Sequence, residues 1–298
     1  MTGQNQLIDR NALLRNRARR VTQQGTFLHD LAIADVQDRL MMVNKSFKEV
    51  AIITGWADPW AAAFPAARVI EDTDVLDLSV QSCDLIINAL ALHCANDPLG
   101  QIIQCARSLR PDGLFIAICF GGQTLQELRS ALATAESQIM GGLSPRVLPM
   151  ADLQDLGALL QRAKLALPVA DSAAQKVAYS DLYALMDDLR AMGEANPMTD
   201  RSRRFTPPSL FQRAEAIYKA EFANSDEQLI ATFEQIFLTG WAPDESQQKP
   251  LRPGSAKIRL ADALGVAEHN LKIDHRHDCL MSGWTNRMTE ECLIKILP

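Results

Sequence analysis

The chain lacks a hydrophobic segment long enough to cross a membrane. Its longest apolar runs, such as Leu114 to Phe120, fall far short of the about 20 residues that a span needs. The first 20 residues contain no continuous apolar core, and the arginines at 15, 17, 19 and 20 follow the weakly apolar part instead of preceding it, unlike in a secretory signal. We therefore expect no membrane span and a cytoplasmic location.

Paired cysteine motifs are also absent. The chain has 6 cysteines and no CxxC, and four of them lie inside apolar segments, where a thiol is most often a small buried hydrophobe. His275, His277 and Cys279 alternate and would share one face of a strand. Three ligands with no paired spacing elsewhere form a weak zinc pattern, however. We predict neither disulfides nor a metal site.

Basic residues are outnumbered: 30 lysines and arginines face 36 acidic residues, which gives a net charge of −6. Broad nucleic-acid binding is therefore not expected. The hydrophobic content of 47% excludes disorder over most of the chain, and 298 residues suffice for a substantial core. These values are typical of an ordinary globular protein.

What is present is an alternation of helices and buried strands. Two helices are predicted first, over 9–20 and 27–43, because apolar residues recur there at helical spacing. Three runs that are apolar on both faces follow, at 50–53, 84–89 and 114–120, and predicted helices over 98–109 and 125–139, the second capped by Thr124, come after the last two. The turn-forming residues 110–113 precede the third strand. Doubly buried strands alternating with helices indicate a parallel α/β sheet.

The second half of the chain is less regular. A short helix at 151–163 and a strand at 165–179 precede two helices, at 181–192 and 208–222, which read as an insertion before a last strand at 230–238. We expect that strand to run antiparallel at the C-terminal edge of the sheet. The predicted organisation is N-terminal helices over 1–48, an α/β domain over 49–264 with a helical insertion about 181–224, and a tail over 265–298 of unknown role.

Several segments resemble class I S-adenosylmethionine-dependent methyltransferases. The turn Arg110-Pro111-Asp112-Gly113 before a buried strand is similar to a turn of that superfamily, and so is the segment from Asp84 to His93 followed by Asn96-Asp97-Pro98. A more specific downstream set comprises Phe120-Gly121-Gly122-Gln123-Thr124-Leu125, Gly142-Leu143-Ser144-Pro145, Asp155-Leu156-Gly157, Met192-Gly193-Glu194, Gly240-Trp241 and Gly254-Ser255-Ala256. It resembles the branch of the complex I assembly factors that hydroxylate an arginine and, more distantly, malonyl-acyl-carrier-protein O-methyltransferase.

The resemblance implies a Rossmann-like fold, S-adenosylmethionine as cofactor, and a protein or carrier-bound acid as partner or substrate. One motif departs from the pattern. The cofactor loop after the first strand normally holds an acid and three glycines, but here Ile53 to Pro59 keeps only Gly55 and contains Trp56. Only one short strand, 68–70, fits before Asp84, so the strand that carries the ribose-binding acid is missing. We expect S-adenosylmethionine not to bind in the usual way.

Three functions therefore compete: an active methyltransferase, a non-catalytic descendant (a pseudoenzyme) that serves as a binding module in complex I assembly, and an enzyme for another small ligand. The resemblance assigns Gly55, Asp72, Asn88 and His93 to the cofactor site. Asp72 either contacts an adenine amino group or is a solvated turn acid. Asn88 and His93 follow a strand at the carboxyl edge, where α/β ligands bind; His93 is either a general base or a packed structural residue.

Two polar segments are candidates for binding a partner. Arg201, Arg203 and Arg204 form a basic run in an acidic chain, which suits an acidic protein or a phosphopantetheine carrier but is also typical of a solvated loop. Ser246 and Gln247 open a polar segment that either folds over the sheet edge as a lid or returns along the surface without a ligand.

Overall fold

A computed structural model describes residues 6–21 and 25–248 of the chain. Its centre is a six-stranded mixed sheet with the strand order β2-β1-β3-β4-β6-β5. The strands are β1 (Val50–Thr54), β2 (Arg68–Ile70), β3 (Cys83–Ala89), β4 (Leu109–Phe120), β5 (Ala166–Tyr179) and β6 (Leu229–Trp241). The first four pair in parallel, whereas β6 runs antiparallel to both β4 and β5. This is the predicted Rossmann-like α/β fold.

The pairing of β2 determines whether the sheet contains the strand that would carry a ribose-binding acid. Ile52 pairs with Val69 and Ile53 with Ile70, so β2 lies directly beside β1. No other strand separates the two, as expected from the short connection between Gly55 and Asp84. The carboxyl ends of β1, β2, β3 and β4 share one edge of the sheet, because parallel strands end on the same side.

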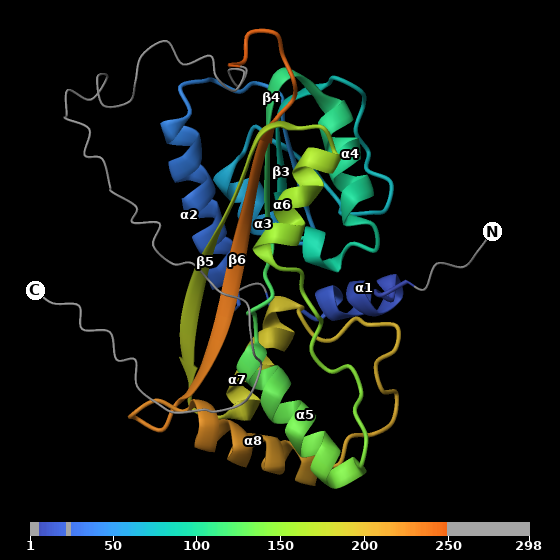
Figure 1. Cartoon of the computed structure of the whole chain (residues 1–298), viewed down its shortest axis with the longest axis vertical. Helices are drawn as coiled ribbons and strands as arrows, with labels where there is room; N and C mark the ends of the chain where they lie inside the picture. Colours follow the sequence, from blue (N-terminus) through green and yellow to red (C-terminus); the bar gives the residue numbers. More distant parts are fainter. Residues whose placement is uncertain (1–5, 22–24, 249–298) are drawn as a thin grey trace, which may run out of the picture. The chain divides into compact units, whose positions relative to one another are not determined.

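The helices form layers on the two faces of the sheet. They are α1 (Arg10–Ala18), α2 (Phe27–Met42), α3 (Ala57–Ala63), α4 (Pro98–Ser108), α5 (Gln126–Met140), α6 (Leu153–Arg162), α7 (Leu182–Met192) and α8 (Pro208–Phe222), with a 3-10 turn η1 (Leu92–Cys94). Figure 1 shows α2 and α3 on one side of the sheet and α4 and α6 on the other, while α5, α7 and α8 lie together beyond the carboxyl ends of the parallel strands. The insertion of α7 and α8 between β5 and β6 is the predicted one.

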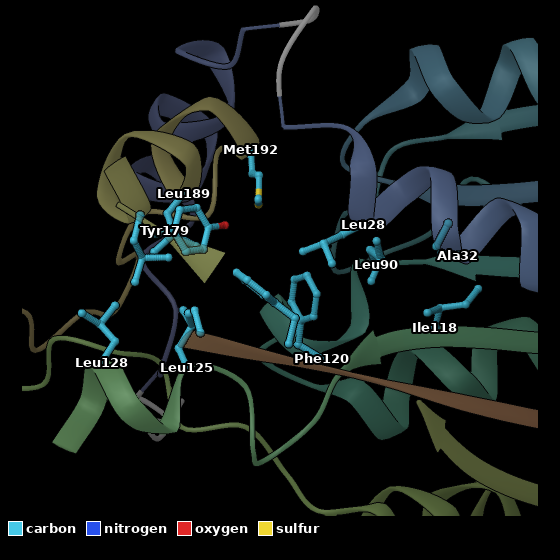
Figure 2. Close-up of a cluster of buried hydrophobic side chains, with 14 of the residues drawn as sticks. Leu28, Ala32, Leu90, Ile118, Phe120, Leu125, Leu128, Tyr179, Leu189 and Met192 are labelled. Carbon is cyan, nitrogen blue, oxygen red and sulfur yellow. The ribbon is translucent and has the colours of Figure 1, made fainter. Parts of the chain in front are cut away.

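Two hydrophobic clusters hold these layers together. The larger joins α2, α3, α5, α7 and α8 to one face of the sheet, and the smaller joins α4 and α6 to the other. Figure 2 shows how α2, β4, α5 and α7 converge in the larger cluster, through Leu28, Phe120, Leu128 and Leu189. Burial on both faces explains why β1, β3 and β4 are continuous apolar runs.

Three local predictions are wrong. The last strand, β6, is internal and β5 forms the edge, because β6 pairs on both sides. Thr124 does not cap α5; its hydroxyl donates to the Glu234 carbonyl at 3.2 Å, and Leu125 with φ 54° precedes the helix. Residues 110–113 belong to β4 instead of a free turn. Among the described residues, no helix is long and apolar enough to cross a bilayer.

Candidate functional site

The candidate site lies at the carboxyl edge of the parallel strands, and the N-terminal helix contributes a cation to it. Gly55 follows β1, Asp72 follows β2, and η1 with His93 follows β3. Helix α1 begins at Arg10, after Asp9, whose side chain accepts from the Ala12 backbone N–H as a normal N-cap does. Arg10 and Arg17 of α1 thereby reach Asp72 at the sheet edge.

Arg17 and Asp72 form a buried, two-pronged ion pair at this edge. Arg17 Nη1 lies 2.7 Å from Asp72 Oδ1, and Nη2 lies 2.8 Å from Oδ2. Arg10 also donates to Oδ1, at 3.0 Å. The exposed fraction is 8% for Arg17 and 4% for Asp72. Burial alone would raise the pKa of Asp72, but the hydrogen bonds and charge of Arg17 outweigh it and lower that pKa.

The guanidinium of Arg17 also fills the space beside Gly55. A Cβ placed on Gly55 would lie 2.1 Å from Arg17 Cζ, closer than any real contact. The position therefore requires glycine while Arg17 is in place. The resemblance assigns this space beside the first strand to the cofactor, and here the Arg17 side chain occupies it.

Trp56 closes the edge further, as its bulk suggested. It is 4% exposed and packs edge-on against His29, with ring centroids 5.1 Å apart. The Arg20 guanidinium lies over the Trp56 ring, 4.9 Å from its centroid. The Trp60 indole N–H donates to His29 Nδ1 at 2.9 Å, which requires that nitrogen to be unprotonated. Burial lowers the pKa of His29 to about 4, so the imidazole is neutral at pH 7.

Helix α1 is fastened to both the sheet domain and the insertion. The Ile8 backbone exchanges two hydrogen bonds with the Asn96 side chain, at 2.9 and 3.1 Å. Asp9 receives a hydrogen bond from Arg201 at 2.9 Å, and Ile8 forms a bridge with Met198. These contacts keep Arg17 at the sheet edge.

His93 and Glu194 lie next to this ion pair. The His93 side chain is 2% exposed, and its Nε2 lies 3.4 Å from Glu194 Oε2. Its ring packs against Phe120, with centroids 4.7 Å apart. Burial lowers the pKa of His93, but Cys94 and Glu194 together raise it to about 10. Among the described residues, His93 Nδ1 and both polar atoms of the Asn88 side chain are buried without a hydrogen-bond partner.

A cavity of about 320 Å³ opens beside Glu194. Its walls are mostly apolar side chains of α5, α7 and α8 and of the loop before α6; Glu194, Arg146, Arg190 and Arg201 supply charge. All three arginines are already paired, Arg146 with Glu136 at 2.7 Å, Arg190 with Asp187, and Arg201 with Asp9. The volume falls at the lower end of the range for small-molecule sites.

The structure gathers some of the residues expected at the site and separates others. Four of the expected residues lie at or beside the carboxyl edge: Gly55, Asp72, His93 and Arg201. Asp72 is a buried ion-pair partner, so the alternative that it is a solvated turn acid is wrong. Arg203 and Arg204 are exposed.

Ser246 and Gln247 do not join the site. Gln247 donates to Asp112 at 3.1 Å, near the start of β4, because antiparallel β6 ends beside Leu114. The prediction that this segment forms a lid over the carboxyl edge is therefore wrong for Ser246 and Gln247. The rest of the predicted lid, 249–255, lies outside the described residues. The same holds for His275, His277 and Cys279. Arg17 and Glu194 were missed. Helix 9–20 carries several arginines, and nothing in its pattern marks the one that turns inward.

The sheet and the motifs along it define the class: the chain belongs to the class I S-adenosylmethionine-dependent methyltransferase superfamily. It is 42% identical over 196 residues to the mitochondrial arginine hydroxylase NDUFAF5 of Dictyostelium discoideum, a match that covers 65% of this chain and 45% of that protein. It is 32% identical over 188 residues to the malonyl-[acyl-carrier protein] O-methyltransferase of Laribacter hongkongensis, over 63% of this chain and 61% of that enzyme.

Among solved structures, the YcgJ protein of Bacillus subtilis aligns with a TM-score of 0.47 and 14% identity, over 70% of this chain and 97% of that one. No family model matches the chain. The chain spans about half the length of the curated relatives it matches, between 45% and 61% of each.

The residues at the edge do not fit S-adenosylmethionine. Arg17 fills the space beside Gly55, Trp56 is packed into the core, and β2 lies against β1 with no strand between them for a ribose-binding acid. Asp72, which would receive an adenine amino group, already accepts from two guanidinium groups. We therefore derive no methyl-transfer step from this geometry.

Proposed function

We propose that this protein is a non-catalytic member of the methyltransferase superfamily that binds a segment of a partner protein in the cavity beside Glu194. The single observation that carries the proposal is the Arg17–Asp72 ion pair. Its two side chains fill the space that the resemblance assigns to the cofactor. An open cavity next to a filled cofactor space suits binding better than catalysis.

The proposed partner is a protein of respiratory complex I assembly. Support comes from the match to arginine hydroxylases named NDUFAF5, and from the assembly role that the resembling branch implies. Arg203 and Arg204 are exposed next to Arg201, a cavity-lining residue, and would meet acidic groups of that partner. The cytoplasmic location stays a prediction, since the matched relative is mitochondrial.

A carrier-bound acid is the alternative ligand, favoured by the match to malonyl-[acyl-carrier protein] O-methyltransferase. The cavity is the right size for a short acyl group, but the three arginines that line it, Arg146, Arg190 and Arg201, are already paired with Glu136, Asp187 and Asp9. A free carboxylate would have to break one of these pairs. We therefore rank the protein segment first.

The first experiment is calorimetric titration of the full chain with S-adenosylmethionine and S-adenosylhomocysteine, with a class I methyltransferase as the positive control. We expect no heat of binding and no rise in melting temperature at millimolar ligand, because a ligand that binds only the native state stabilises it. A dose-dependent rise would reinstate an active methyltransferase.

The second experiment fills the cavity. Leu132→Trp places an indole in the cavity wall, and Met41→Trp adds the same group on α2 at a residue that is 76% exposed. Proteins cross-linked to each variant in source cells are compared with those of the wild type. We expect Leu132→Trp to lose complex I subunits or assembly proteins that Met41→Trp retains. Equal sets would refute binding through the cavity.

A further inference from the structure

Three side chains with metal-binding chemistry meet where η1 approaches the end of α7. His93 and Cys94 are consecutive in η1, and Glu194 follows Gly193, the residue that ends α7. One potential ligand atom from each residue lies within 4.8 Å of the other two. His93 and Glu194 are 101 positions apart in the sequence, so the cluster is a product of the fold.

The backbone around Glu194 fixes its position. Gly193 has φ 83°, a conformation that glycine adopts without strain, and the chain turns there at the end of α7. The Gly193 N–H donates to the Arg190 carbonyl at 3.0 Å, and the Glu194 N–H to the Leu189 carbonyl at 2.9 Å. The side chain of Glu194 therefore projects from a defined turn toward His93.

The cluster contains an unsatisfied donor or acceptor. His93 Nδ1 is buried and, within the described part of the chain, makes no hydrogen bond. Cys94 is 3% exposed, whereas the Glu194 side chain is 22% exposed. A buried polar atom without a partner costs free energy, and a ligand at this point would reduce that cost.

The donor set identifies the kind of ion. An imidazole nitrogen, a thiolate sulfur and a carboxylate oxygen are the three ligand types that Zn²⁺ uses, whereas Mg²⁺ and Ca²⁺ prefer oxygen alone. We propose that His93, Cys94 and Glu194 bind one Zn²⁺ ion beside the cavity. Bond lengths of about 2.0–2.3 Å place tetrahedral zinc ligands roughly 3.5 Å apart, so binding draws the cluster together. The Glu194 side chain, the most exposed of the three, moves toward the ion while its backbone stays in the turn.

The surrounding charges are compatible with a cation at this point. Arg17 interacts electrostatically with both Cys94 and Glu194, but its charge is neutralised by Asp72 through two hydrogen bonds. A thiolate and a carboxylate together balance the charge of a divalent ion. Three protein ligands leave a fourth position of the zinc open, and both Phe120 and Glu194, which contact His93, line the cavity. The fourth position is therefore accessible from the cavity.

The test uses the full chain, stripped with a chelator and then titrated with Co²⁺, a spectroscopic substitute for zinc, and with Zn²⁺ itself. We expect one equivalent to bind, with a thiolate-to-cobalt charge-transfer band in the near ultraviolet and displacement of cobalt by zinc. Cys94→Ser should remove that band, and Cys119→Ser, a buried cysteine of β4 outside the cluster, should keep it. Failure of the wild type to bind one equivalent would leave only a His93–Glu194 ion pair and overturn the proposal.

Two further variants test whether the ion binds at this cluster or at another part of the chain. Glu194→Gln removes the most exposed ligand and should weaken zinc binding by more than about tenfold without unfolding the chain, as checked by circular dichroism. The double variant His277→Ala/Cys279→Ser removes two of the three alternating histidine and cysteine residues near the end of the sequence and should bind zinc normally. Loss of binding in the tail variant, or unchanged binding in Glu194→Gln, would place the ion elsewhere and refute the cluster. The proposal does not depend on the proposed partner.

Discussion

Replacing Arg17 by methionine should destabilise the protein strongly. Methionine keeps most of the length of the side chain and removes its charge, so Asp72 is left 4% exposed with Arg10 as its remaining partner. Removing one member of a buried ion pair costs about 3–5 kcal/mol. Because Arg10 still donates one hydrogen bond, we expect the lower end of that range, a loss of about 3 kcal/mol in the free energy of unfolding.

The matched control is Arg10→Ala. Arg10 contacts the same carboxylate, but its side chain is 30% exposed, and solvent-exposed pairs contribute about 0.2–1 kcal/mol. Both variants are unfolded in urea and followed by tryptophan fluorescence, since Trp56 and Trp60 lie close to the site. A double-mutant cycle with Asp72→Asn then isolates the coupling between Arg17 and Asp72, for which we expect about 2 kcal/mol.

The pH dependence gives the interpretation a second check. The pKa of Asp72 is lowered in the folded state, so its pairing stabilises the protein above the unfolded value of 3.8. The contribution is lost as the pH falls through the folded pKa. The difference between wild type and Arg17→Met should therefore shrink below pH 3.8. A difference under about 0.5 kcal/mol at pH 7, the usual size for a surface change, would show that Arg17 does not occupy the edge in solution.

Three further predictions concern single residues near the site. The folded pKa of His29 is about 4 against 6.5 unfolded, so its contribution is present above pH 6.5 and is lost as the pH falls toward 4; pH-dependent melts should show about 3 kcal/mol of this loss in the wild type and not in His29→Gln. Gly55→Ala should cost about 2 kcal/mol in urea unfolding, and much less in an Arg17→Ala background, because the three atoms nearest to the added methyl all belong to the Arg17 guanidinium. Gly193→Ala should lower thermal stability by about 1–2 kcal/mol, because φ is 83° there; an unchanged melting temperature would contradict this.

The central sheet could be predicted because its signals are local. The runs at Val50, Leu85 and Leu114 are apolar on both faces, and only a sheet covered on both sides buries such runs. The position of β6 could not be predicted in the same way. An edge strand and an internal strand differ in how many neighbouring strands they pair with. The sequence of Leu229–Trp241 contains no local signal that it pairs with both β4 and β5.

The sequence predicted where the site lies in the fold, but it did not predict all of the residues that form the site. The family resemblance assigned Gly55, Asp72 and His93 to the site, and all three lie at or beside the carboxyl edge. Arg17 and Glu194 depend on contacts between segments far apart in the sequence: Arg17 reaches Asp72 across 55 positions. A basic helix normally faces water, and only the fold shows that one of its arginines turns inward and stays there.

A cofactor site that Arg17 only blocks and a cofactor site that no longer exists predict different affinities for S-adenosylmethionine in the variant Arg17→Ala. If Arg17 only blocked an intact site, displacing it at a cost of about 3 kcal/mol would weaken cofactor binding about a hundredfold, and Arg17→Ala would recover that factor. The structure argues against recovery, because β2 pairs directly with β1 and Trp56 is held in the core by His29 and Arg20. We therefore expect calorimetry of Arg17→Ala with S-adenosylmethionine to show no binding up to about 1 mM, equivalent to less than about 4 kcal/mol of affinity. A dissociation constant in the micromolar range for this variant would show that the site is intact and that α1 acts as its gate.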